Sequence, residues 1–112
     1  MLNEKDYCDY DTCVALMELG FSRWDMPYGI LSKKYLIRLY DAQKWLREKK
    51  NIDISVTISP FEYFATIRKF VFWQGEYSWE KTIHPNGGKT YEEALLEGIK
   101  ESIKILKEVS NG

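Results

Sequence analysis

The fold is decided above all by residues 87–106, GGKTYEEALLEGIKESIKIL. Apolar residues recur at helical spacing through this stretch and its continuation, which predicts an amphipathic helix beginning near Thr90. The predicted apolar side carries Tyr91, Ala94, Leu95, Gly98, Ile99, Ser102, Ile103, Ile105, Leu106 and Val109. Because Gly98 and Ser102 are small and lie in the middle of that side, we expect another element to approach the helix backbone closely there.

The start of this helix carries a capping signal. Thr90 is placed as the N-cap and Glu93 stands three residues later, so the hydroxyl and the carboxylate can each accept from a backbone N–H of the first turn. Acidic residues lead and lysines follow, as the helix dipole favours. The helix is therefore predicted to be a core element and not a membrane-surface helix.

Two earlier helices are predicted. The first covers residues 12–19, with Asp11 as its N-cap and Gly20 in the left-handed position after its end. The second covers about residues 38–50, and its inward face is predicted to carry Leu39, Ala42, Gln43, Trp45, Leu46 and Lys49. Residues 22–32 contain Pro and Gly without a period, which predicts an ordered loop between the two helices.

Three strands are predicted between the second and last helices. Ile52, Ile54, Val56 and Ile58 alternate with polar residues, so one face of the first strand should be buried. Residues 63–73 and 77–83 are rich in aromatic and β-branched residues and flank Gln74-Gly75, which predicts a hairpin. The order α-α-β-β-β-α predicts an α+β fold, a three-stranded antiparallel meander with helices mainly on one face.

Length and composition predict one domain over residues 1–112, which is long enough to bury a core without a metal or a disulfide. Cys8 and Cys13 are the only cysteines; Cys13 is predicted to be a small core residue and Cys8 a plain thiol. Their spacing with the single histidine does not supply the four ligands of a zinc site, so we expect no metal. The polar N-terminus and the lack of a long apolar run predict a cytoplasmic protein with no membrane span.

Gly88-Lys89-Thr90, before the last helix, match the last three residues of the phosphate-binding-loop motif G-x-x-x-x-G-K-[ST]. The full motif needs a glycine five residues earlier, where this chain has Ile83, so nucleotide binding is not predicted. Backbone N–H groups at this helix start remain a candidate anion site, together with His84, Lys89 and Thr90.

No catalytic constellation is evident. His84 has no Ser, Cys or carboxylate at a spacing that marks a general-base partner, and the acidic pairs of the last helix suit a solvated surface. We therefore expect neither enzymatic activity nor a cofactor.

A nucleic-acid-associated regulator is the alternative function. Residues 33–50 hold seven basic against two acidic residues, although the net charge of the chain is −1. Candidate phosphate contacts are Arg38, Lys44, Arg47 and Lys50. Residues 38–109 share the α-β-β-β-α order of double-stranded-RNA-binding domains, but the last helix opens with glutamates where such domains place lysines.

Two further resemblances rest on short motifs. The junction Gly88, Thr90, Glu92, Glu93 and Ala94 resembles the G-x-T-x-E-E-A of HicB-type antitoxins, in which a three-stranded sheet precedes a helix. Over most of its length the chain resembles small uncharacterised proteins of gut Bacteroides-type bacteria and their phages or mobile elements. The stretches that match them are residues 19–21, 42–48, 51–54 and 91–100. This second resemblance implies the fold and no activity.

Aromatic residues make up 15% of the chain, an excess that favours a binding function. Aromatic side chains are frequent anchors of protein interfaces. We therefore predict a non-enzymatic protein-binding or accessory module, in which Trp73, Tyr77 and Trp79 of the aromatic hairpin contact another protein or a second copy of the chain.

Overall fold

The computed structural model describes residues 6–22, 37–71, 76–84 and 89–111. These residues form helices α1 (Tyr10–Glu18), α2 (Leu39–Lys50) and α3 (Tyr91–Asn111) and strands β1 (Ile52–Ile58), β2 (Tyr63–Val71) and β3 (Glu76–Ile83). The predicted loop at residues 22–32 lies outside the described residues beyond Ser22.

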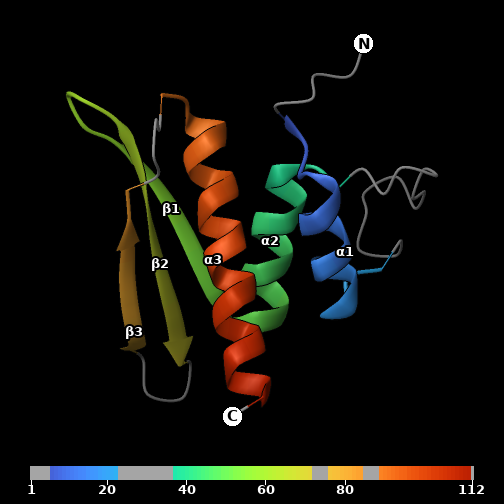
Figure 1. Cartoon of the computed structure of the whole chain (residues 1–112). Coiled ribbons are helices and arrows are strands. Elements are labelled where there is room, and N and C mark those ends of the chain that lie inside the picture. Colours follow the sequence, from blue (N-terminus) through green and yellow to red (C-terminus); the bar gives the residue numbers. More distant parts are fainter. Residues whose placement is uncertain (1–5, 23–36, 72–75, 85–88, 112) are drawn as a thin grey trace.

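The architecture confirms the predicted α+β fold. The three strands form one antiparallel sheet in the order β1-β2-β3. Figure 1 shows the three helices on one side of this sheet, with α3 and α2 nearest to it and α1 farthest away. The core lies between β1, β2 and the two nearer helices, where Leu46, Ile54, Ile67, Leu95 and Ile99 are fully buried.

The predicted close approach at Gly98 is confirmed. A Cβ atom at Gly98 would lie 2.8 Å from Cγ2 of Ile54 and 3.2 Å from Cβ of Ala65, so the sheet reaches the backbone of α3 itself. The neighbouring Ser102 is buried, and its hydroxyl donates to the carbonyl of Gly98 at 2.8 Å, which leaves the buried oxygen of Ser102 satisfied. A larger residue at position 98 would push α3 away from β1 and β2.

The start of α3 follows the capping prediction with one change. The hydroxyl of Thr90 accepts from the Glu93 N–H at 3.1 Å, as expected of an N-cap. The Glu93 carboxylate accepts from the N–H of Lys89 at 2.9 Å, one residue before the expected Thr90 N–H. The hydroxyl and the carboxylate thus each accept from a backbone N–H group that has no partner within the helix.

The predicted cap of α1 is wrong. Asp9, and not Asp11, is the N-cap, and its carboxylate accepts from the N–H of Thr12 at 2.9 Å. The helix therefore begins two residues earlier than predicted. It ends at Glu18, one residue before the predicted end, and Gly20 takes the predicted left-handed position with a φ of 112°. The Gly20 N–H donates to the carbonyl of Met17 and the Phe21 N–H to that of Leu16.

The α2 helix begins at Leu39, directly after its N-cap Arg38. Its inward face is confirmed for the four apolar residues, whereas Lys49 is exposed. Gln43 donates through its side-chain amide to the carbonyl of Ile54 at 2.8 Å, so α2 bonds to β1 as well as packing on it.

The alternation of β1 predicts its buried face only in part. Ile52 and Ile54 are buried and Val56 is half-buried, but Ile58 at the end of the strand is 66% exposed. Figure 1 shows the reason: the β1–β2 end of the sheet curves away from α3 and the other helices. The residues of β1 keep to one face, but the helices cover only the first part of it.

None of the helices in the described parts of the chain is long and apolar enough to cross a membrane.

Candidate interaction surface

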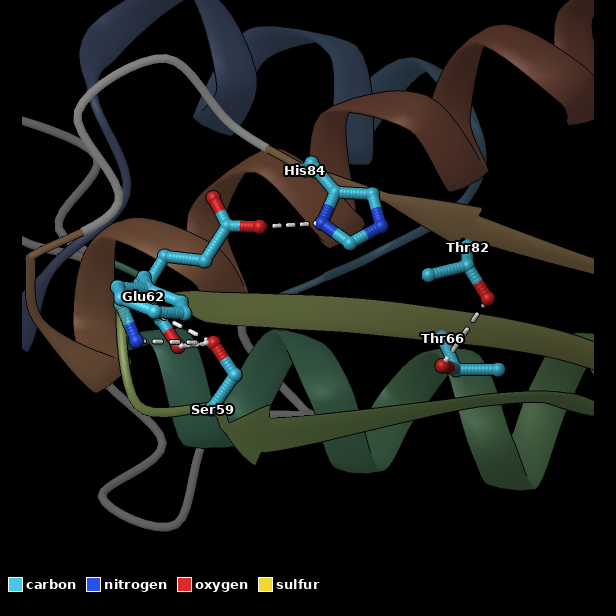
Figure 2. A network of polar contacts seen from close by, with 6 residues as sticks. Ser59, Glu62, Thr66, Thr82 and His84 are labelled. Atoms are coloured by element: carbon cyan, nitrogen blue, oxygen red, sulfur yellow. Dashed lines mark hydrogen bonds and ion pairs between the residues drawn. The ribbon is translucent and has the colours of Figure 1, made fainter.

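The connection between β1 and β2, residues 59–62, is a tight turn organised by Ser59. The hydroxyl of Ser59 accepts from the N–H groups of Phe61 and Glu62 at 3.3 and 3.1 Å and donates to the carbonyl of Glu62 at 3.0 Å. The Ser59 N–H donates to the same carbonyl at 2.8 Å. Pro60 has its φ restricted by its ring, which favours the second position of a turn. Figure 2 shows the bonds around Ser59.

This ordered turn presents apolar side chains to solvent. Phe61 is 96% exposed, and Ile58, which precedes the turn, is exposed over two-thirds of its surface. Single exposed apolar residues are common, but a Phe held almost wholly in water by a hydrogen-bonded turn gains nothing from the fold of its own chain. We call Ile58, Pro60 and Phe61 the turn knob.

A polar pair borders the turn knob. Glu62, just before β2, hydrogen-bonds through its carboxylate to Nδ1 of His84, just after β3. The His84 ring lies 5.2 Å from the ring of Phe64, centroid to centroid, at an angle of 31°. Figure 2 shows Glu62 and His84 pointing toward one another, with Thr66 and Thr82 facing each other farther along the same strands. The pair fixes one ring nitrogen of His84, and Nε2 makes no hydrogen bond to the described residues.

The predicted aromatic partner site is only partly described. Tyr77 and Trp79 lie in β3, where their backbones oppose Phe70 and Lys69 on either side of an irregularity in the pairing. Trp73 lies outside the described residues. Partner binding by these three residues therefore stays a prediction.

The predicted basic residues divide into two groups. Arg38 bonds to the Asp41 carboxylate at 2.9 Å, and the Lys50 ammonium lies 5.6 Å from the centre of the Trp45 ring. Lys44 and Arg47 are exposed and make no ion pair with the residues that the structure describes. The helix places these two on one stripe with Tyr40, whose side chain is half exposed.

The predicted anion-site residues make contacts of their own within the chain. His84 is paired with a carboxylate, while the Thr90 hydroxyl and the Lys89 N–H are bonded within the cap of α3. Anion binding at these residues stays a prediction. Across the described parts of the chain, no group of three metal-ligating side chains occurs.

Sequence reasoning missed the turn knob. Its signal was the tetrapeptide SPFE between two strands, residues 59–62, in which a turn serine and proline are followed directly by a phenylalanine. A large apolar residue inside a predicted turn has no neighbouring strand position to pack into, and it is therefore a candidate for exposure.

Comparisons of the chain with protein-family models, with curated proteins and with solved structures found no match.

Proposed function

We propose that the protein is a protein-binding module and that the turn knob is its principal contact. The observation that carries the proposal is the 96% exposure of Phe61 on a turn held by four hydrogen bonds. A turn whose backbone is already ordered loses less conformational entropy when a partner binds it, and buried aromatic anchors contribute much of the energy of many interfaces.

The partner should be a different protein with a concave apolar pocket. The turn knob is convex, and Glu62 is the only charged residue between Ile58 and Tyr63, so basic side chains at the rim of the pocket would complement it. Phe61 would fill the pocket and Ile58 would pack against its wall.

The test begins with a photo-reactive benzoylphenylalanine in place of Phe61, and a matched probe in place of Tyr10, which is also exposed. The protein crosslinked at position 61 is then purified, and its Kd is measured for the wild type and for Phe61→Ser. We expect Phe61→Ser to weaken binding at least about 30-fold, the effect of losing an interface anchor. Ile58→Ser should weaken it less.

Tyr10→Ser is the control variant, because it removes an exposed aromatic ring far along the chain from the turn knob. It should leave the Kd unchanged. Equal binding by wild type and Phe61→Ser would overturn the proposal, as would crosslinks between copies of the chain, which would indicate self-association. A selective loss with Trp79→Ala would instead support the predicted hairpin site.

A second candidate function, binding of single-stranded nucleic acid, is favoured by the stripe of Tyr40, Lys44 and Arg47. An exposed ring can stack on a base while the two neighbouring cations contact phosphates. Fluorescence anisotropy with labelled single-stranded RNA should then show affinity that falls steeply with salt, and Lys44→Ala should reduce the salt slope by about one. Lys104→Ala, at an exposed lysine of α3, is the matched control. Absent or salt-insensitive binding would remove this candidate.

A further inference from the structure

The strongest remaining feature is a pair of cysteines at the start of α1. With Asp9 as the N-cap, Cys8 is the residue before the cap and Cys13 is the fourth residue of the helix. Residues at these two positions pack against each other in the hydrophobic staple that fixes how a chain enters a helix. In this protein the staple consists of two thiols.

The contacts around both cysteines agree with this geometry. Cys8 is 5% exposed and Cys13 is 1% exposed, and both are free thiols in the core. The Cys13 thiol donates to the carbonyl of Cys8 at 3.7 Å, and the Cys8 N–H donates to the carbonyl of Ile37 at 2.8 Å. Tyr7 also pairs with Arg38. The two cysteines therefore lie where the N-terminal segment pairs through its backbone with the residues just before α2.

The two thiols differ in acidity. A hydrogen bond between them, together with burial, raises the pKa of Cys8. The same hydrogen bond lowers the pKa of Cys13 to about 7, against the opposing effect of burial. Since the thiolate is the nucleophile in disulfide chemistry, Cys13 is suited to attack first and Cys8 to complete the bond.

We propose that Cys8 and Cys13 form a thiol–disulfide exchange site that small disulfides oxidise to an intrachain disulfide. The Cys13 thiolate attacks one sulfur of the small disulfide, whose S–S bond breaks and releases one thiolate. Cys8 then loses its proton to water, and its sulfur attacks Sγ of Cys13. The mixed S–S bond breaks and the second small thiolate leaves. The two cysteines lose two electrons, and the small disulfide gains them as two protonated thiols.

The new bond would replace a contact between thiols by a covalent link across the entry to α1. It closes the short loop from Cys8 to Cys13, which includes the capping residue Asp9. Because both thiols are buried, oxidation should proceed through local opening of the N-terminal segment, at a rate below that of the unfolded chain. At equilibrium the folded chain should favour the disulfide more than the unfolded chain does, because the fold holds the two thiols together.

The experiment incubates the folded protein with hydroxyethyl disulfide and its thiol at set ratios. Free thiols are counted, and the intact mass and the unreduced peptide map are recorded. We expect loss of both thiols with no retained hydroxyethyl group and a linked peptide that contains Cys8 and Cys13. The equilibrium constant for disulfide formation should exceed that of the same chain in denaturing urea by about tenfold or more. By linkage, the oxidised protein should then have a higher melting temperature than the reduced protein.

Single variants test the order of attack. Cys8→Ser, whose hydroxyl can still donate to Sγ of Cys13, should trap the hydroxyethyl group on Cys13, whereas Cys13→Ser should react more slowly at Cys8; Cys8→Ala and Cys13→Ala serve if a serine variant does not fold. Three results would overturn the proposal: stable mixed disulfides in the wild type, no thiol loss while the unfolded chain reacts, or an equilibrium constant equal to that of the unfolded chain.

Discussion

The two halves of β1 carry the same alternation of aliphatic and polar residues but have different surroundings. Ile54, in the first half, is 2% exposed beneath α2 and α3, whereas Ile58, at the end of the second half, is 66% exposed and belongs to the turn knob. We call these the covered half and the open half. A period-two pattern selects the face to which side chains point, but it does not ensure that another element covers that face.

The difference also separates two sources of order. In the covered half, the sheet is held by close packing, to the point where Ile54 contacts the backbone region of α3 at Gly98. In the open half, order comes from pairing with β2 and from the hydrogen bonds of the Ser59 turn, which leave the apolar side chains in solvent. Substitutions in the covered half should therefore change stability, and those in the open half should change binding.

The largest expected effect is that of Ile54→Ala. Removing this buried side chain should lower the free energy of unfolding by about 2–5 kcal/mol, because transfer and cavity terms add. Ile58→Ala, the same change in the open half of the same strand, should stay within about 0.5 kcal/mol of wild type. Urea unfolding followed by circular dichroism measures both. Equal losses would show that the two halves are covered alike.

Gly98→Val should have the next largest effect. Its side chain would enter the space occupied by Ile54 and Ala65, and overpacking of this kind costs about 1–3 kcal/mol. Lys104→Val is the control, because it places the same side chain on an exposed position of α3 and should cost only about 0.5 kcal/mol through helix propensity. A Gly98→Val protein as stable as the control would mean that α3 can shift freely on the sheet.

Ser59→Ala should cost about 1 kcal/mol, since it removes the hydroxyl that organises the turn while leaving the main-chain bond in place. The same change should weaken partner binding, because the backbone at Phe61 would lose its bond to Ser59 and the turn would be less ordered before binding. Ser55→Ala is the matched control in β1, where the hydroxyl bonds only to the Asp53 carboxylate among the described residues. Thermal unfolding and the Kd of the crosslinked partner give the two readouts. Unchanged binding by Ser59→Ala would mean that turn order is irrelevant to the contact.

The smallest effect concerns how the start of α1 is held against α3, the helix that covers the sheet. Partial burial raises the pKa of Asp9, but hydrogen bonds from Thr12 and the ammonium of Lys100 outweigh it and lower the pKa below 3.8. A lowered pKa in the folded state adds stability above the unfolded value of 3.8, and this stability is lost as the pH falls through the folded pKa. Asp9→Ala should cost about 0.5–1 kcal/mol at neutral pH, and the difference from wild type should shrink in acid.

Urea unfolding of both proteins at neutral pH and well below pH 3.8 measures this change. Asp9→Asn is the control, since it keeps an oxygen for the Thr12 N–H but has no charge to titrate. A difference between wild type and Asp9→Ala that does not change with pH would show that the carboxylate charge contributes nothing to the stability of α1.

Local signals predicted much of this fold. The α3 periodicity, its Thr90 cap and the small residues at Gly98 and Ser102 each depend on neighbours within a few turns of one helix, and each is confirmed. Gly20 is likewise a local requirement, because its positive φ is costly for any residue with a Cβ. Predictions of this kind need no knowledge of the distant chain.

The cysteine pair shows how a small local error hides a site. Asp9 and Asp11 are equally good caps by residue type, and only the pairing of Tyr7 with Arg38, through the backbone bond from Cys8 to Ile37, extends the segment so that Asp9 caps. With Asp11 as the cap, Cys8 and Cys13 do not occupy the positions of a staple. The spacing of the two cysteines in the sequence was therefore not enough to predict the contact between their thiols.

By itself, the sequence determined the kinds of element, their order, the antiparallel meander and the apolar faces of α2, α3 and the first part of β1, because periodicity and capping are set by nearby residues. Only the tertiary structure decided how far the helices extend over the sheet. That depends on where α3 begins relative to the end of β1 and on the curvature of the sheet, which are relations between residues distant in sequence. The exposure of Phe61 follows from those relations, and the burial of the two thiols follows from the pairing of the N-terminal segment with the residues just before α2.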